Sequence, residues 1–439
     1  MKYLMCLLLL CLSLFQTVAA EQVLLSGGHI IDVKTGRVMD GSILVSDGRI
    51  SRISTGEDIS DGADVIDMAG KFLLPGLIDA HSHVAASALL VPNQAPGSLM
   101  RQNFEISTAE RAVRATANLQ SLLSSGFTTI RDVGLGGNFA DTAVADGVAE
   151  GWIAGPRVIA SGKIIGPLGT HANAGLNPEQ PELQFIDHII TDTPDEMRAA
   201  VRWNMQHGAR AIKLVVEHGL LYYTEDEIRA AVDEANRAGL RVAAHSFSDK
   251  ATQNAIRAGV SSIEHGFNLG DATLKMMART GTWLVDTTFT EGSLDMATAA
   301  NTQRWVSRLK RAHELGVPIA YGSDVFWHEP GRTRGEISLD SVNSYVLAGI
   351  SNAEILRFIT INAAAVIGVE HETGSLEAGK SADIIALDAN PLENIDALRD
   401  VSFVMKQGAI YKQAGHFSYE PTGFGRTRDA VSSDHAIND

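Results

Sequence analysis

The stretch Ala211-Ile212-Lys213-Leu214-Val215-Val216 decides how the rest of the chain can fold. It is a short apolar run bounded by Gly208 and Gly219, which is typical of a buried strand. Lys213 stands in its middle, and an ammonium carried into an apolar interior is strongly unfavourable unless it is paired, neutralised or chemically changed. The remainder of the chain must therefore provide partners or chemistry for a buried lysine.

Strands and helices alternate on both sides of this stretch. Helical patterns such as 225–238 and 251–258 are each closed by a glycine. The expected strands lie at 77–80, 128–131, 157–160, 212–216, 241–244, 262–264, 282–285 and 318–321. Eight such units predict an α/β fold of the (β/α)8 TIM-barrel type. A doubly wound open sheet is the alternative, but that fold usually carries a glycine-rich turn after its first strand, where this chain has histidines.

The two ends of the chain share a sequence pattern that differs from that of the middle: short alternating strands separated by glycine turns. This pattern covers residues 21–74 and returns at 374–412, on either side of a barrel at 75–373. The economical arrangement is one small β-sandwich domain assembled from both ends, and two unrelated edge extensions are the alternative. Residues 413–439, rich in Gly, Ser, Thr and Asp, are expected to form an exposed C-terminal extension.

The first 20 residues have the features of a secretory signal peptide. Met1-Lys2 supplies a positive start, residues 4–15 are nearly all apolar, and Thr17-Val18-Ala19-Ala20 offers small residues for cleavage. The apolar run is short for a membrane-spanning helix, so cleavage is favoured over an uncleaved anchor. We therefore expect a secreted or periplasmic protein.

Charge and cysteine content exclude several classes of function. The net charge of −16 argues against nucleic acid and against an anionic membrane surface as partners. Both cysteines, Cys6 and Cys11, lie inside the predicted signal peptide, so disulfides and thiol chemistry are excluded for the mature chain. No later hydrophobic run approaches membrane length, and no membrane span is expected in the mature chain.

Histidines and an aspartate stand where the expected strands end. His81 and His83 follow the first strand two residues apart, so both imidazoles can reach one ion. His245, His265 and Asp324 end the fifth, sixth and eighth strands. The C-terminal ends of barrel strands form the face that carries active sites. Any one of these residues alone would more often be structural, but together they predict a metal centre.

Lys213 belongs to the fourth expected strand, between the first histidine pair and His245. An ammonium beside ligands for a divalent metal ion would be unfavourable through burial and through like charge. Reaction with carbon dioxide would turn Lys213 into a carbamate, an anionic oxygen donor able to bridge two metal ions. The alternative is an unmodified Lys213 paired with Glu217 or Asp132.

At these positions the chain resembles the amidohydrolase superfamily in its binuclear, carboxylated-lysine subtype. The resemblance rests on Leu74-Pro75-Gly76-Leu77-Ile78-Asp79-Ala80-His81-Ser82-His83 and on Gly374-Ser375-Leu376-Glu377-Ala378-Gly379-Lys380-Ser381-Ala382-Asp383, and it covers nearly the whole mature chain. The ligand set that it implies is His81, His83 and Asp324 for one metal ion, His245 and His265 for the other, and N6-carboxylated Lys213 bridging both.

This set predicts a mechanism for amide hydrolysis. A water between two divalent ions would be converted to hydroxide near neutral pH and would attack the scissile carbonyl. Asp324 is the catalytic residue expected to take the proton and pass it to the leaving nitrogen. The nitrogen and oxygen ligands favour Zn²⁺, with Mn²⁺ and Co²⁺ as alternatives.

The expected substrate comes from a narrower resemblance. Arg131-Asp132-Val133-Gly134, His171 and Tyr222-Tyr223 are spaced as in the Xaa-Pro dipeptidase group, which includes prolidase-like carboxypeptidases and amidohydrolases that cleave ochratoxin A. The resemblance implies a small dipeptide or N-acyl amino acid with a free carboxylate. Candidate substrate-binding residues are His171, Tyr223, Tyr222, Arg332 and Arg334, with Phe326 and Trp327 as an apolar wall. A surface histidine, packing tyrosines and solvated arginines are the alternatives.

Other functions remain open at the level of sequence. Imidazolonepropionase-like enzymes open cyclic amides, but they typically use one metal ion and lack the modified lysine. A lactonase or phosphotriesterase would use the same metal set, and a non-catalytic barrel would be expected to have lost ligands. Relatives are often homo-oligomers, so a homo-oligomer is expected here too.

Overall fold

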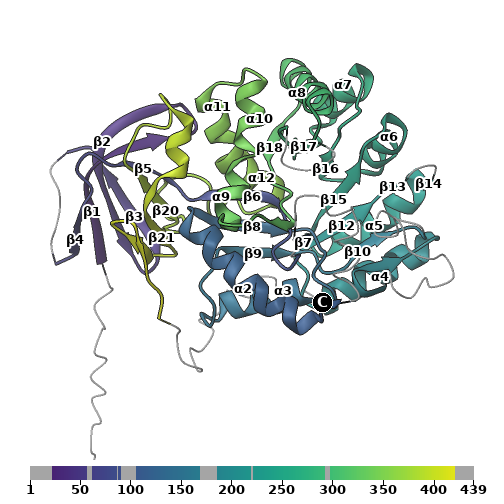
Figure 1. The fold of residues 1–439 in the computed structure, drawn as a ribbon, viewed down its shortest axis with the longest axis horizontal. Helices are drawn as coiled ribbons and strands as arrows, with labels where there is room; N and C mark the ends of the chain where they lie inside the picture. Colours follow the sequence, from purple (N-terminus) through teal and green to yellow (C-terminus); the bar gives the residue numbers. More distant parts are fainter. Residues whose placement is uncertain are drawn as a thin grey trace, which may run out of the picture.

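The computed structural model describes residues 22–56, 62–86, 88–89, 105–168, 185–218, 221–291 and 297–420. The predicted signal peptide, His171 and residues 421–439 of the predicted extension lie outside these ranges. Figure 1 shows two units side by side: a sheet built from both ends of the chain, purple and yellow, and a barrel of strands and helices coloured blue to green.

Within the described residues, eight parallel strands at the expected positions form the barrel. They are β6 (Leu77–Ser82), β8 (Phe127–Asp132), β9 (Arg157–Ala160), β12 (Ala211–Val215), β15 (Arg241–Ser246), β16 (Ser262–His265), β17 (Trp283–Asp286) and β18 (Ile319–Tyr321). Two short strands that the sequence pattern did not predict, β10 (Ile164–Gly166) and β11 (His188–Ile190), pair beyond the edge of β12. The prediction of a TIM barrel is confirmed.

Two seams close the strands into a ring. Between the last and first strands, the amide of Asp324 donates to the carbonyl of His81 at 2.8 Å, and the Ser323 hydroxyl donates to Asp79 at 2.6 Å. Between β9 and β12, the amide of Arg210 donates to the carbonyl of Ala160 at 2.7 Å. The first seam joins the chain just before His83 to the chain at Asp324, so it brings distant parts of the sequence together at the barrel mouth.

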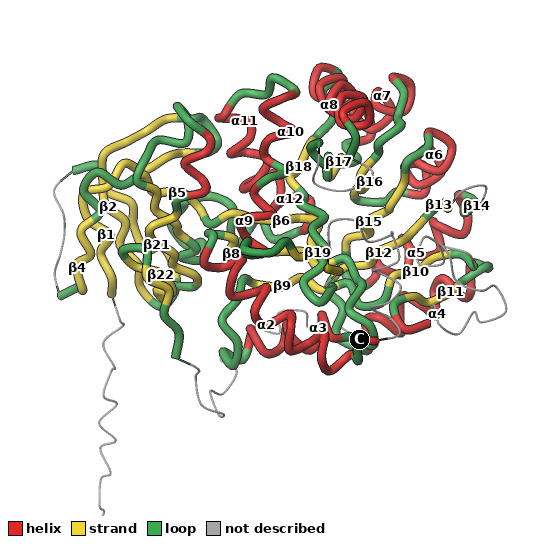
Figure 2. The backbone as a smooth tube through the Cα atoms, viewed as in Figure 1, coloured by secondary structure: helices red, strands yellow, loops and turns green. Residues whose placement is uncertain are grey.

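Helices cover the outside of the barrel (Figure 2). They are α2 (Thr108–Ser124), α3 (Ala140–Ala149), α4 (Pro194–Gln206), α5 (Glu225–Arg237), α6 (Asp249–Ala258), α7 (Asp271–Thr280), α8 (Ala299–Glu314), α9 (Arg334–Leu339), α10 (Val342–Leu347), α11 (Asn352–Arg357) and α12 (Ala363–Ile367). α5 begins at a capping box in which Thr224 and Glu227 satisfy each other's backbone amides. α6 ends at Gly259, whose φ of 90° is accessible to glycine without strain. Both match the predicted helices.

The strands from the two ends of the chain form one nine-stranded sheet. Its members are β1 (Gln22–Asp32), β2 (Arg37–Ser46), β3 (Arg49–Ser54), β4 (Asp64–Asp67), β5 (Phe72–Pro75), β20 (Ile384–Leu387), β21 (Val401–Lys406), β22 (Ala409–Gln413) and β23 (His416–Phe417). The two ends meet where β5 pairs antiparallel with β20. The prediction that both ends build one unit is confirmed.

This terminal sheet curves over a core of its own. Ile384 and Ala386 pack into that core, whereas Ile385 and Leu387 on the opposite face pack into the core of the barrel. The alternation follows the two-residue period of a strand and fixes the sheet against the barrel. Ile50 near the far edge exchanges backbone hydrogen bonds with residues 379–380 just before β20, so the expected sandwich is one continuous, curved sheet.

The barrel mouth carries two small strand pairs. β13 (Glu217–His218) pairs with β14 (Leu221–Tyr222), and β7 (Ala88–Leu89) pairs with β19 (Trp327–His328). Both follow barrel strands at their C-terminal ends, where they frame the site. None of the described helices is both long and apolar enough to cross a bilayer.

Candidate metal centre

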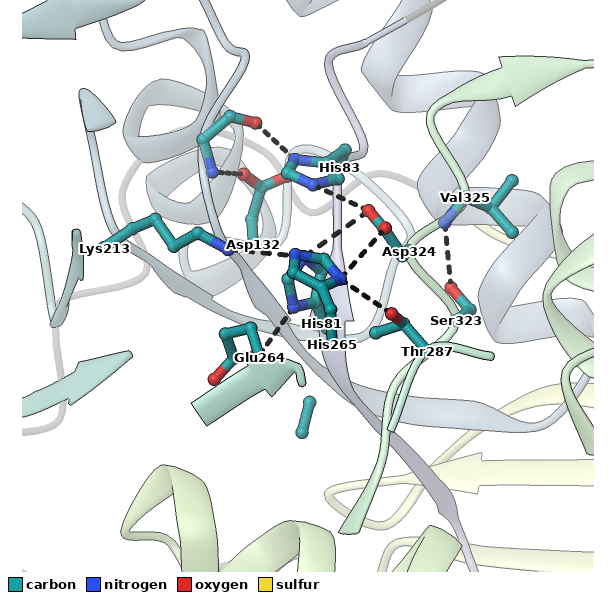
Figure 3. Close-up of polar contacts among 12 residues, drawn as sticks. His81, His83, Asp132, Lys213, Glu264, His265, Thr287, Ser323, Asp324 and Val325 are labelled. Atoms are coloured by element: carbon teal, nitrogen blue, oxygen red, sulfur yellow. Dashed lines mark hydrogen bonds and ion pairs between the residues drawn. The ribbon is translucent and has the colours of Figure 1, made fainter. Parts of the chain in front are cut away.

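Three buried side chains from different strands converge at the barrel mouth. His81 lies in β6, His265 ends β16, and Asp324 follows β18. Their potential ligand atoms all lie within 4.8 Å of one another. His83 joins them, because its Nε2 is 3.2 Å from Oδ1 of Asp324 (Figure 3). A carboxylate oxygen and several imidazole nitrogens therefore share one small volume.

The other two predicted ligands border the same volume. The His245 ring centroid lies 4.6 Å from that of His265. Lys213 extends toward the cluster from the side opposite Asp324, and its Nζ is 3.5 Å from Nε2 of His81 (Figure 3). The structure thus brings all six predicted ligands together at the face where barrel active sites form.

The backbone is strained at two of these residues. His265 has φ of 69° and Asp324 has φ of 52°, both in the left-handed region that residues with a side chain seldom adopt. Such conformations cost about 1–3 kcal/mol and persist where surrounding contacts impose them, commonly at functional sites. Each occurs where a strand ends and the chain turns away from the barrel.

Hydrogen bonds at Nδ1 orient two of the histidines for metal binding. Nδ1 of His83 lies 2.9 Å from the carbonyl of Gly134, which can only accept, so Nδ1 donates and Nε2 is the nitrogen left to bind a metal ion. Nδ1 of His81 lies 2.5 Å from the carboxylate of Glu264, with the same consequence. Both free Nε2 atoms point toward Asp324, as a metal ion would require.

Glu264 is a buried carboxylate that the sequence interpretation missed. One oxygen accepts from Nη2 of Arg131 at 2.8 Å, and the other holds His81. Burial alone would raise the pKa of Glu264, but Arg131 and His81 outweigh burial and hold that pKa well below its usual range. A charged residue inside the short strand Ser262–His265 was the available signal, of the same kind as Lys213 in β12.

The protonation states favour a cation at this place. Burial raises the pKa of Asp324, but His81, His83 and His265 overcome burial and hold it well below the ordinary value. Burial lowers the pKa of His265 well below its ordinary value. An ionised carboxylate beside several imidazole nitrogens is a donor set that suits Zn²⁺ and similar ions, so the residues present fit the predicted group.

Lys213 is fully enclosed, and burial lowers its pKa from 10.5 to about 8, although Glu264 and Asp324 partly oppose the change. Neither of the two alternative partners holds it. Glu217 accepts from Ser246 and from the backbone amide of Ser248. Asp132 accepts from the amides of Val84 and Gly134 at 2.7 and 2.9 Å. The simple ion pair considered from the sequence is therefore not formed.

A model of the amidohydrolase family matches residues 72–412. The chain belongs to the amidohydrolase family. As a member it is a hydrolase of amide bonds, and members of the family typically use divalent metal ions. The matched residues include the whole barrel and the strands β20 and β21 of the terminal sheet.

Named relatives and solved structures resemble this amidohydrolase over most of its length. It is 27% identical over 384 residues to an ochratoxinase of Aspergillus niger, covering 78% of this chain and 76% of the relative. It is 27% identical over 420 residues to an imidazolonepropionase of Brevibacillus brevis, covering 87% of this chain and 92% of that one. The structure of a Xaa-Pro dipeptidase with bound methionine in the active site matches with a TM-score of 0.79 and 30% identity, covering 89% of this chain and 100% of that chain.

The two predicted substrate tyrosines of this amidohydrolase have different surroundings. Tyr223 is only 2% exposed, and its hydroxyl donates to the carbonyl of Thr191 at 2.8 Å, among core residues outside the ring of strands. This favours the alternative of a packing tyrosine and corrects the assignment of Tyr223 as a substrate contact. Tyr222 is exposed on β14, and its role stays a prediction. His171 lies outside the described residues.

The predicted arginines are engaged with the protein itself. Arg334 is buried and donates to the backbone carbonyls of Ala86, His83 and Val325. It therefore ties the loop after β6 to the loop after β18, which corrects its assignment as a carboxylate ligand. Arg332 pairs with Glu329 and Asp340 at 2.7 Å each, so binding a substrate would require exchange of these partners.

The expected apolar wall is only partly available. Trp327 is 2% exposed, and its indole nitrogen donates to Glu329 at 3.0 Å. It packs in a cluster with Phe289, while the neighbouring Phe326 is half-buried. Trp327 is therefore packed inside the protein between Phe289 and Phe326, and its own ring is not open to a substrate.

Proposed function

We propose that this amidohydrolase is a binuclear metal-dependent enzyme that cleaves the amide bond of a small substrate carrying a free carboxylate. The observation that carries the proposal is the convergence of His81, His83, His265 and Asp324 with Lys213 and His245 at the C-terminal face of the barrel. One-metal hydrolysis would not need an enclosed lysine beside the histidines, whereas a second metal ion does need another anionic ligand.

The substrate class is proposed from relatives of two kinds. A Xaa-Pro dipeptidase and a prolidase complexed with N-methylphosphonate-L-proline are both similar structures at 29–30% identity. The ochratoxinase is a relative in sequence. We propose that an Xaa-Pro dipeptide or an N-acyl amino acid, including an ochratoxin-like amide, is the substrate.

The residues of the site would share the work as follows. Bound divalent ions would supply an activated water and polarise the scissile carbonyl. Asp324, ionised at neutral pH, would accept a proton from water and donate it to the leaving nitrogen. Glu264 and the carbonyl of Gly134 would hold the imidazoles of His81 and His83 in position.

Carboxylation of Lys213 is part of this proposal. The neutral amine attacks carbon dioxide, a C–N bond forms, and one proton leaves to give a carbamate anion. A pKa lowered to about 8 increases the fraction of neutral amine near pH 7. The anion would replace a buried cation by a metal ligand, which removes the electrostatic conflict in β12.

A cyclic-amide hydrolase is the second candidate. The match to imidazolonepropionase over 420 residues favours it. Lys213 weighs against it, because a one-metal centre leaves that lysine without a function. Lactones or phosphotriesters, which suit the same metal centre, are included below as test substrates.

We further propose a secreted or periplasmic enzyme that has lost residues 1–20 and assembles as a homo-oligomer. N-terminal sequencing of the protein from the native host would find Glu21 as the first residue. Light scattering coupled to gel filtration would give the oligomer mass. A mature protein that still carries residues 1–20 would contradict the proposed cleavage. A monomeric mass would contradict the proposed homo-oligomer.

Metal content and substrate range test the main proposal. Purified protein should hold about two divalent ions per chain, measured by plasma mass spectrometry, and should lose activity on chelation. Xaa-Pro dipeptides and N-acyl amino acids should be hydrolysed faster than hydantoin-like cyclic amides, lactones or phosphotriesters. A folded, fully active protein without metal would overturn the metal centre, and turnover of lactones or phosphotriesters alone would overturn the substrate class.

A further inference from the structure

An aromatic stack leads from helix α8, on the outside of the barrel, to the candidate metal centre. Phe267 stacks on Trp305 with ring centroids 4.4 Å apart and an interplanar angle of 22°. On its other side, Phe267 stacks on Phe247 at 5.2 Å and 14°. The three rings come from three loops or helices and are nearly parallel, so together they present one apolar column.

Only the outer end of this column is accessible. Trp305 is 2% exposed and Phe267 is 4% exposed, whereas Phe247 is half-buried. The ring of Phe247 lies beside two predicted metal ligands, with its centroid 4.5 Å from that of His245 and 5.5 Å from that of His265. The column therefore ends in an aromatic surface directly beside the reaction centre.

The backbone that carries Phe247 is fixed by a buried carboxylate. Glu217, which follows β12, accepts from the amide of Phe247, from the amide of Ser248 at 2.6 Å and from the hydroxyl of Ser246 at 3.0 Å. An aromatic surface held this firmly loses little conformational entropy when a ligand binds to it. Phe267 stacks on the Phe247 ring, which is only half-buried, so part of the ring remains accessible beside His245 and His265.

We propose that Phe247 determines substrate specificity by stacking against an aromatic or bulky apolar side chain of the substrate. The substrate ring would continue the column formed by Phe247, Phe267 and Trp305. This inference rests on the proposed amide hydrolysis and names the side-chain class of its substrate. The apolar wall of the site is then formed by the loop after β15. Phe326 and Trp327, which the sequence suggested for this role, make no ring contact with the described site histidines.

The expected discrimination follows from the size of aromatic interactions. A favourable ring pair contributes about 0.5–1.5 kcal/mol beyond simple burial. This corresponds to about 2- to 12-fold in affinity. Removal of the Phe247 ring should therefore change binding of the substrate, seen in KM, while kcat stays close to its original value.

The test compares ligands that differ only in a ring. One pair places the ring on the amine side of the amide, N-acetyl-L-phenylalanine against N-acetyl-L-alanine. The other pair places it on the acyl side, N-benzoylglycine against N-acetylglycine. Wild type, Phe247→Leu, Phe247→Trp and the control Phe72→Leu, which alters a half-buried ring of β5 in the terminal sheet, would each be measured for kcat and KM and for ligand affinity by calorimetry.

Wild type should favour the ring in one of the two pairs by about 10-fold. Phe247→Leu should reduce that preference to within about 2-fold through KM, Phe247→Trp should keep it, and Phe72→Leu should leave it unchanged. Equal affinities in both pairs, or an unchanged preference in a folded, metal-loaded Phe247→Leu protein, would overturn the proposal. If no amide is hydrolysed, the proposed function fails, and the calorimetric comparison still decides whether Phe247 binds the ring.

Discussion

Two lysines of the described residues are buried, one at the barrel mouth and one where the terminal sheet meets the barrel. Lys213 is 2% exposed and Lys406 is 4% exposed. Burial lowers the pKa of each from 10.5 to about 8. By residue type, burial and pKa the two are alike, so these properties alone do not distinguish a functional lysine from a structural one.

Their neighbours differ. Nζ of Lys406 donates to the carbonyl of Gly155 at 2.7 Å and lies 5.6 Å from the centre of the Tyr411 ring. Lys406 therefore has structural partners for its ammonium within the protein. Nζ of Lys213 instead lies 3.5 Å from Nε2 of His81, an atom suited to hold a metal ion. The chemistry of the neighbouring atom, rather than burial, therefore distinguishes the lysine that we propose as a metal ligand from the structural one.

The largest difference between the two lysines should appear when each ammonium is removed by substitution. Lys213→Ala should hold fewer than two metal ions per chain and lose about 100-fold or more of the activity, because a bridging ligand is gone. Short carboxylic acids should restore part of both. Lys406→Met should keep the metal content and activity of wild type. Elemental analysis and steady-state kinetics measure both, and a fully active, two-metal Lys213→Ala protein would contradict the assignment.

A smaller loss of metal binding is expected when Glu264, which contacts the proposed ligand His81, is changed. Glu264→Gln removes the charge that holds His81 while keeping the shape of the side chain. Loss of such a supporting carboxylate typically lowers metal affinity by about 10- to 100-fold. Competition with a chelating dye measures this affinity. Glu372→Gln, which alters an ion pair with Arg49 at the sheet surface, is the matched control and should leave it unchanged.

The convergence of the candidate metal ligands could be predicted because each stands at the end of a strand. In a barrel, periodicity places such residues on one face, so His81, His265 and Asp324 follow from strand positions alone. Glu264 was missed because its importance depends on Arg131 from a strand distant in sequence. The left-handed backbone at His265 and Asp324 was equally inaccessible, since it is imposed by contacts across the barrel.

Residues in the connections that follow the strands, including the first residue of the short helix α9, were less predictable than strand residues. Tyr223 and Arg334 were expected to face a substrate, and each instead satisfies partners within the fold. A loop side chain has no fixed periodicity, so its direction follows from tertiary contacts that one sequence does not reveal. The same limit hid β10 and β11, whose three-residue lengths carry almost no pattern.

The remaining prediction concerns the pH dependence of stability rather than metal binding or activity, and it tests Lys406 directly. The unfolded chain keeps this proton up to a pH of about 10.5, whereas the folded chain releases it near its pKa of about 8. Between these values the unfolded state binds more protons, so the free energy of unfolding rises with pH, by at most about 3 kcal/mol for one such lysine. Urea denaturation at several pH values should show a weaker rise in Lys406→Met than in wild type. Identical pH profiles would mean that Lys406 stays protonated throughout, with its ammonium donating to the carbonyl of Gly155. The two lysines would then share burial but not a lowered pKa.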